Sequence, residues 1–359
     1  MIKILIIFNF LLCLNQSNDI LSNWECGSDF DISNNALAIT NTNREGNKAV
    51  IRSQIWEIHR SDSLFEMGEN AIENGFQRLI DVYKEHGILF NISNRDIIYS
   101  DSLYYFAYNQ RPFELMTSHS IDNMMNFFYL PNIDYTGGTL TGYGQAFDIG
   151  GNELMVAGYE CQYVGNNQEC YDLADTFIPI HEAGHCLGLY HTHSNTYGDE
   201  HVIRLEDEEP GNCEVNCTSA ADFLCDTEAS LSLKNDVMYN GDSCSYTLTE
   251  SDSCGYVYEP QLDNFMSYTH FECGSSFTPD QVDRMFYYIE NNNSVRQTII
   301  PQGDLNDDSQ INVLDIVLIV DAILMGEDIL DINLWLGDLN EDGLVNILDV
   351  VIIVNIILD

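Results

Sequence analysis

The sequence His-Glu-Ala-Gly-His-Cys-Leu-Gly-Leu-Tyr-His runs from residue 181 to residue 191 and determines the expected organisation of the chain. His181 and His185 are four residues apart, so on a helix their rings project from the same face, one turn apart. Gly188 can leave the helical conformation, which lets the chain turn and bring His191 back to the same point. This spacing predicts one Zn²⁺ ion bound by His181, His185 and His191, with the fourth position open.

Glu182 adds an acid beside the first histidine of this motif. A carboxylate there can reach a water in the open position, which makes Glu182 the candidate general base and later proton donor. The alternative is a structural zinc site or an inactive scaffold. Structural zinc sites are usually closed by four protein ligands and seldom need a neighbouring acid, so the motif favours a hydrolytic centre. His193 lies near the motif but misses its spacing.

Composition limits the environment and partners of the chain. Its 359 residues are enough for one large domain and smaller segments. The net charge of -44 would repel nucleic acid and anionic lipid, so neither is an expected partner. An apolar run over residues 4–14 ends in polar residues, which predicts a signal peptide over residues 1–17 and no membrane span, since the run is too short. We therefore expect a secreted, extracellular protein.

Periodicity outlines an α+β domain. Strands are predicted at Ala49–His59, Ile88–Ile92, Tyr143–Ile149 and Glu153–Tyr159, the last two at the rim of a sheet. Helices are predicted at Ala71–His86, ended by Gly87, at Asp172–Tyr190, and after the Thr278-Pro279-Asp280 start signal. Residues 193–262 read as an irregular, disulfide-stapled stretch able to bind calcium, and residues 291–301 as a linker.

Two repeats with a period of 34 residues occupy the C-terminal region, residues 303–359. Each has oxygen-bearing side chains at positions 1, 3, 5, 9 and 12 of a loop, which is EF-hand-like calcium spacing. The candidate ligands are Asp304, Asn306, Asp308, Asn312 and Asp315, then Asp338, Asn340, Asp342, Asn346 and Asp349. Each loop ends in Asp rather than Glu, lacks an obvious helix before it, and is followed by an apolar stretch predicted to be helical (Ile316–Leu324 and Val350–Leu358). Ser309 stands where Gly343 serves in the second loop.

The chain resembles the pappalysin family of metzincin metallopeptidases. The motifs that carry the resemblance are residues 181–191, Cys-Asp-Thr (225–227), Asn-Phe-Met-Ser-Tyr (264–268), Phe-Thr-Pro-Asp-Gln-Val-Asp-Arg-Met (277–285) and, more weakly, 142–147. The resemblance implies a zincin-like catalytic domain over residues 49–298, with a mixed twisted sheet, a long zinc helix and an irregular lower subdomain. A linker at 299–302 and a small helical module at 303–359 would follow it.

The same resemblance suggests roles for further residues. Met266 would form the Met-turn beneath the zinc, and Tyr268 would either stabilise the oxyanion or serve as a buried aromatic. Glu228 replaces the family's usual proline, which leaves the calcium loop around Asp226 open. Glu272 follows the Met-turn in a segment that, by the resemblance, forms the wall of the pocket after the scissile bond. It therefore predicts a preference for cleavage before basic residues, and the alternative is a surface acid beside a disulfide.

Eleven cysteines, most of them between Cys161 and Cys273, indicate disulfides formed in an oxidising compartment. We expect Cys161 to pair with Cys170 and Cys225 with Cys273, although connectivity cannot be read from sequence. Cys26-Gly27 lies in a leader or short pro-segment, residues 18–48. Cys26 is either a zymogen switch whose thiolate occupies the zinc or half of an ordinary disulfide.

The expected function is that of a secreted zinc-dependent endopeptidase that hydrolyses protein or peptide substrates. The repeats resemble type I dockerin modules, which implies structural Ca²⁺ and a cohesin-like or cell-surface partner; self-association or anchoring is the alternative role. The alternative to the enzyme is a non-catalytic extracellular binding protein with a degenerate peptidase domain. The intact Glu182 favours the enzyme.

Overall fold

The computed structural model describes residues 47–64, 67–68, 70–104, 113–130, 144–164, 167–193, 198–204, 213–233, 236–325 and 331–358. The predicted signal peptide, Cys26 and nearly all of the leader lie outside the described residues. Among the helices of this described part, none has the length and apolar character needed to cross a membrane.

The main sheet has five strands in the order β2-β1-β3-β5-β4. These are β1 (Ala49–His59), β2 (Ile88–Tyr99), β3 (Met125–Leu130), β4 (Gly144–Ala146) and β5 (Glu153–Ala157). All neighbours are parallel except the edge strand β4, which is antiparallel to β5. The predicted α+β class and mixed sheet are confirmed, and the prediction of residues 49–59 is correct to the residue. The two rim strands are shorter than predicted.

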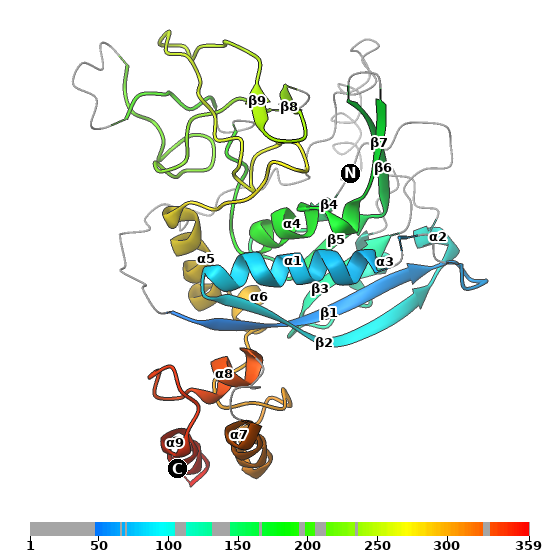
Figure 1. Cartoon of the computed structure of the whole chain (residues 1–359), viewed down its shortest axis with the longest axis vertical. Helices are drawn as coiled ribbons and strands as arrows, with labels where there is room; N and C mark the ends of the chain where they lie inside the picture. The colour runs from blue at the N-terminus through cyan, green and yellow to red at the C-terminus, as the bar shows by residue number, and fades with distance from the viewer. Residues whose placement is uncertain are drawn as a thin grey trace, which may run out of the picture.

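Two helices, α1 (Ala71–Glu85) and α4 (Ile178–Cys186), lie on one face of the sheet (Figure 1). The Tyr83 hydroxyl donates a 2.8 Å hydrogen bond to the Ile180 carbonyl oxygen and so joins the two helices. The prediction of α1 is confirmed, and Gly87 follows it with a φ of +83°, a conformation that glycine adopts without strain. Short helices α2 (Asp101–Tyr104) and α3 (Phe113–Thr117) flank the sheet. The core between the layers includes Ile51, Ile55, Phe76, Leu79, Phe127, Leu154 and Ile180.

The predicted helix over residues 172–190 is wrong at both ends. A 3₁₀ turn at Leu173–Asp175 precedes α4, and the Asp172 side chain accepts a hydrogen bond from the Ala174 N–H there. Thr176 is extended, and α4 then begins with Pro179 in its first turn. At the other end Gly188 has a φ of +91°, which ends the helix before His191. Side-chain capping and this turn therefore shorten the zinc helix.

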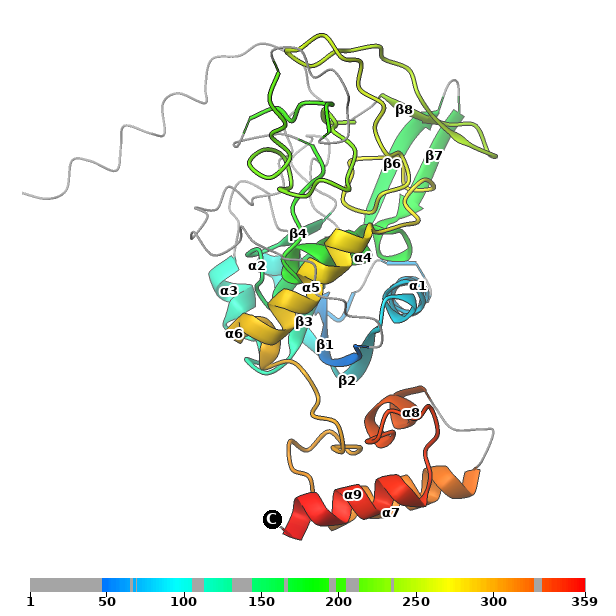
Figure 2. The same cartoon turned by 90° about the vertical axis from the view of Figure 1, so that its left-hand side faces the viewer.

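An irregular region lies on the side of α4 away from the sheet (Figures 1 and 2). The hairpin of β6 (Tyr159–Val164) and β7 (Asn167–Asp172) projects toward it, and the small hairpin of β8 (Val237–Tyr239) and β9 (Cys244–Tyr246) lies within it. The register of β6 and β7 places Cys161 opposite Cys170. Their disulfide stays a prediction.

Three disulfides hold this irregular region: Cys213–Cys254, Cys217–Cys225 and Cys244–Cys273. The predicted Cys225–Cys273 pair is therefore wrong. Cys225 closes a tight loop with Cys217, eight residues away, whereas Cys273 reaches β9. The predicted irregular, cross-linked character of residues 193–262 is otherwise confirmed over the described residues.

Helix α5 (Pro279–Asn291) fastens the irregular region to the rest of the domain. Thr278 is its N-cap in a capping box with Gln281, as predicted from the start signal. The Asp226 carboxylate accepts hydrogen bonds from Thr278 Oγ1 (2.9 Å) and from the Asp280 N–H (2.8 Å), so it binds the helix N-terminus. Arg284 donates to the carbonyl oxygens of Asp222 and Phe223.

The stretch expected to be a linker, residues 291–301, is packed against the sheet. It contains α6 (Asn293–Arg296), and its end runs along β1. The Arg52 N–H donates to the Thr298 carbonyl oxygen and the Ile300 N–H donates to the Val50 carbonyl oxygen, both at 2.8 Å. Pairing with the part of β1 that β3 does not reach explains why this stretch is ordered.

The C-terminal repeats form three helices below the sheet: α7 (Val313–Met325), α8 (Asp331–Gly337) and α9 (Ile347–Leu358). Figure 1 shows α7 and α9 side by side, and both views place α8 between them and the sheet (Figures 1 and 2). Both predicted helices are confirmed, whereas α8, just before the second loop, was not expected. Their apolar core is continuous with Val50 and Leu89 on the sheet.

Candidate metal centre

The three motif histidines converge on one point. The Nε2 atoms of His181, His185 and His191 lie 3.0–3.1 Å from one another, and all three rings are buried. Three nitrogens bound tetrahedrally to one Zn²⁺ would be roughly 3.3 Å apart, so the arrangement fits that ion. These residues form a group that could hold a metal, as the spacing predicted.

Backbone carbonyl groups fix two of these rings. His181 Nδ1 donates to the Phe265 carbonyl oxygen and His185 Nδ1 to the Leu189 carbonyl oxygen, each at 2.7 Å. With the proton held on Nδ1, each Nε2 presents a lone pair to the shared point. Burial lowers the pKa of His181 to about 4 and that of His185 well below its ordinary value. Both rings are therefore neutral at physiological pH, as a metal ligand requires.

Glu182 is held by the edge strand of the sheet. Its side chain is buried, and Oε2 accepts a 2.7 Å hydrogen bond from the Ala146 N–H of β4. A Cβ at Gly144 would lie 2.7 Å from Glu182 Oε1, so only glycine fits there without displacing one of the two groups. Burial raises the pKa of Glu182 to about 8, against the opposing effect of the Ala146 hydrogen bond. A carboxylate with a raised pKa, fixed beside a histidine cluster, suits proton transfer.

The turn carrying Met266 lies against the histidine helix. A Cβ at Gly184 would lie 2.7 Å from Met266 Sδ, so the thioether packs closely on α4. The Tyr268 ring centroid lies 4.5 Å from that of His191 and 4.4 Å from that of His193. The structure thus brings Met266 and Tyr268 to the metal centre.

Glu272 is not brought into a buried pocket. Its side chain is exposed, and its backbone N–H donates to His270 Nδ1 at 3.2 Å. Four contributors to the centre were missed from the sequence. The Phe265 and Leu189 carbonyl groups and the Ala146 N–H are backbone groups with no side-chain signal. His193 stacks on His191 with centroids 5.0 Å apart, and its spacing of two along the extended chain after Gly188 was the available signal.

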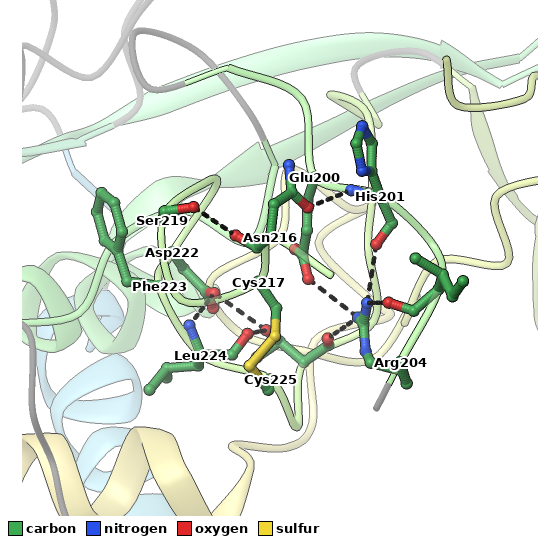
Figure 3. The surroundings of a disulfide bond; sticks show 12 residues. Glu200, His201, Arg204, Asn216, Cys217, Ser219, Asp222, Phe223, Leu224 and Cys225 are labelled. Carbon is green, nitrogen blue, oxygen red and sulfur yellow. Dashed lines mark hydrogen bonds and ion pairs between the residues drawn. A yellow bond between two sulfur atoms is a disulfide. The ribbon is translucent and has the colours of Figure 1, made fainter. Parts of the chain in front are cut away.

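A pair of buried carboxylates lies in the irregular region, near the Cys217–Cys225 disulfide (Figure 3). Glu200 Oε1 is 3.0 Å from Arg204 Nη2, while the Asp222 carboxylate accepts from the Leu224 N–H and from Thr227 Oγ1. Burial is the largest cause that raises the pKa of Glu200 to about 8 and that of Asp222 to about 6. These acids form a buried polar cluster rather than a solvated surface.

The two repeat loops share one hydrogen-bond pattern. The first and last loop residues are buried acids: Asp304 and Asp315 in one loop, Asp338 and Asp349 in the other. Asp304 accepts from the N–H groups of residues 308 and 309, and Asp315 from those of 305, 306 and 312. The corresponding bonds recur in the second loop. Ser309 and Gly343 both have positive φ, so the serine adopts the conformation that favours glycine.

Comparison with known proteins gives local similarities to metallopeptidases. No family model matches the chain. It is 35% identical to human pappalysin-1 over 122 residues and 32% identical to mouse pappalysin-1 over 129 residues, in both cases over 32% of this chain and 6% of the relative. An extracellular metalloprotease of Verticillium alfalfae is 26% identical over 164 residues, which is 46% of this chain and 44% of that protein. The chain therefore spans less than half of each of these relatives.

Solved structures also match the chain, and two of them are described next. Mirolysin in complex with compound 9 has a TM-score of 0.45 at 13% identity, over 71% of this chain and 97% of that one. Metalloproteinase-II from Bacteroides fragilis has a TM-score of 0.25 at 14% identity, over 48% and 50%. The sequence relatives, together with the histidine cluster and the disulfides, indicate an extracellular, metallopeptidase-like domain.

Proposed function

We propose that this protein is a secreted zinc endopeptidase of the metzincin type. The observation that carries the proposal is the convergence of His181, His185 and His191 Nε2 beside the buried Glu182 carboxylate. A Zn²⁺ ion held by the three histidines would supply Lewis-acid polarisation of the scissile carbonyl. The local similarity to pappalysin-1 and to a fungal extracellular metalloprotease supports the same reaction class.

Four features of the chain would assist peptide hydrolysis. Glu182 takes a proton from the attacking water and returns it to the leaving amine, while the Ala146 N–H keeps its carboxylate in place. The Tyr268 hydroxyl donates to the developing oxyanion. Met266 packs under the histidine helix and keeps the ligands in register. The Phe265 and Leu189 carbonyl groups hold the ring orientations.

Casein hydrolysis by the purified chain tests this proposal. We expect one bound zinc per molecule, activity that a chelator abolishes, and recovery on adding Zn²⁺. Zinc binding without hydrolysis of casein, gelatin or a peptide library would instead support the alternative, a non-catalytic binding protein with a degenerate peptidase domain.

We also propose that the C-terminal repeats bind one Ca²⁺ per loop, with the ten side chains predicted as ligands. The donor set fits the ion, because it consists of carboxylate and amide oxygens around two buried acids in each loop. Each carboxylate oxygen has two lone pairs, so the backbone hydrogen bonds leave acceptor capacity for a cation. Circular dichroism during calcium titration tests this: we expect helical signal to increase with Ca²⁺, and a chelated spectrum that is already fully helical would contradict it.

Attachment and specificity are further parts of the proposal. The outer faces of α7 and α9 expose apolar side chains, including Val317, Leu324, Ile347 and Leu358, which supports docking to a cohesin-like or cell-surface partner.

Glu272 would favour cleavage before basic residues. Cleavage-site profiling with wild type and Glu272→Gln tests this point: an unchanged preference in the variant would rule out this role for Glu272.

A further inference from the structure

The two repeat loops contact the rest of the described chain, residues 47–301, in different ways, although their sequences and internal hydrogen bonds are alike. These residues are called the peptidase-like part below. One basic residue of that part lies near the first ligand of each loop. Arg52 Nη2 is 3.8 Å from Asp304 Oδ2, and Lys48 Nζ is 3.9 Å from Asp338 Oδ2. The arginine side chain is 4% exposed, whereas the lysine side chain is 40% exposed. The same type of contact is thus buried at the first loop and solvated at the second.

Among the described residues, further polar contacts join the first of these loops to the strands. Arg52 Nε forms an ion pair with Asp307, at the fourth position of the first loop, and Nη2 lies 3.4 Å from Ser309 Oγ. The other Asp307 oxygen accepts a hydrogen bond from Ser93 Oγ of β2. In the second loop the equivalent fourth position is Glu341, which is exposed.

Arg52 is also fixed at its backbone, so it cannot move away easily. Its N–H donates to the Thr298 carbonyl oxygen, and on β1 it shares a face with Val50. Val50 packs in the apolar core of the repeats together with Leu89. A change in the conformation of the first loop is therefore transmitted directly to β1 and β2.

We propose that the two loops are unequal cation sites, because Arg52 places a buried positive charge against the first loop and couples it to the sheet. The inference rests on the proposed binding of calcium by the repeats. Arg52 opposes the charge of a cation at Asp304 in a surrounding with little water, so the first loop binds Ca²⁺ more weakly. The solvated Lys48 is screened and has little effect on the second loop. By linkage, a cation at the first loop weakens the contact with Arg52 and so loosens the attachment of the repeats to the sheet, whereas a cation at the second loop acts mainly within the repeats.

Calcium titration calorimetry of the chelated full-length chain tests the inequality. We expect two dissociation constants that differ by about tenfold or more. Asp304→Asn should remove the weaker site and Asp338→Asn the tighter one. Arg52→Met should tighten the weaker site by about tenfold, whereas the matched control Lys48→Met should change the tighter site by less than about threefold. Arg52→Lys keeps the positive charge and should leave the affinity of the weaker site unchanged. This variant is measured in place of Arg52→Met if the methionine variant does not fold.

Thermal unfolding followed by near-ultraviolet circular dichroism tests the coupling. Calcium should lower the unfolding temperature of the peptidase-like part in wild type and in Asp338→Asn, and much less in Asp304→Asn. Two equal constants that Arg52→Met leaves unchanged would overturn this inference while leaving the proposed calcium role intact. Absence of any calcium binding would overturn that role and the inference with it.

Discussion

The two regions on either side of α4 are held together by different interactions. On one side is the upper region (residues 49–186), which in Figure 1 is drawn beneath the irregular loops. It is a five-stranded sheet whose first strand is buried at ten consecutive positions and packs against α1 and α4. On the other, the lower region (residues 198–276) has little regular structure and depends on three disulfides and buried polar contacts. The difference shows that hydrophobic packing fixes the helix that carries His181 and His185. The disulfide-linked loops hold the turn of Met266 and Tyr268 against that helix.

The largest expected effect belongs to the upper region. Glu182→Gln keeps the size of the side chain and an oxygen that can accept from the Ala146 N–H, but it removes the base. We expect kcat/KM to fall by about 10²-fold to 10⁴-fold, with zinc content and circular dichroism unchanged. Glu153→Gln, a change of the same chemistry on β5, is the control and should leave the rate within about twofold. Equal rates for wild type and Glu182→Gln would refute the assignment.

Disulfide removal tests whether cross-links really hold the lower region. By the loop-entropy relation, replacing Cys244 and Cys273 with alanine should cost about 3.5 kcal/mol of unfolding free energy, because that bond closes a 29-residue separation. The same change at Cys217 and Cys225, which are eight residues apart, should cost about 2.5 kcal/mol. Urea denaturation measures both. The comparison fails if the shorter loop costs more, or if neither variant loses stability.

The buried acids make the lower region sensitive to pH. Burial raises the pKa of Glu200 to about 8, so the folded protein keeps a proton that the unfolded chain releases above its ordinary pKa of 4.5. The free energy of unfolding should therefore fall as the pH rises from about 4.5 to about 8. Glu200→Gln should flatten this slope in urea denaturation with chelator present. Glu259→Gln, at an exposed position of the same region, is the matched control; a slope that survives in Glu200→Gln would exclude Glu200 as its source.

The smallest expected effect comes from a lower-region residue at the centre. Tyr268→Phe keeps the ring beside His191 and His193 but removes the hydroxyl. We expect kcat to fall about tenfold with little change in KM, because an oxyanion donor acts mainly in the transition state. Steady-state kinetics on a fluorogenic peptide measure both constants. An unchanged kcat would show that Tyr268 is only a packing residue.

The sequence predicts those features of the fold that depend on neighbours in the chain. Alternating apolar residues predict β1, helical spacing predicts α1, and the Thr278 cap predicts the start of α5. The same method overextends the zinc helix, because Asp172 satisfies a backbone N–H with its side chain and favours a 3₁₀ turn over a longer α-helix. Pairing of Cys225 with Cys217 rather than Cys273 depends on the path of the loop, to which residue type gives no guide.

The candidate site also has a part that the sequence predicts and a part that it does not. Fixed spacing predicts that His181, His185 and His191 share one point, because helix geometry and one glycine turn determine their positions. The groups that orient them come from distant segments through backbone atoms, as Phe265 does for His181. Arg52 is a further case, since its place against the first repeat loop depends on how the repeats pack on the sheet.

The return of the chain to its first strand has a consequence for the order of folding. Ile300 donates to the Val50 carbonyl oxygen, so β1 gains its last backbone partner from a segment made about 250 residues later. At synthesis rates of roughly 5–20 residues per second, the start of β1 waits on the order of ten seconds to a minute for that partner. During this interval the N–H of Arg52 and the carbonyl of Val50 form part of an unpaired strand edge, where pairing with another chain is a hazard. Ribosome-bound chains that stop before residue 298 should therefore aggregate more readily than chains that extend past it.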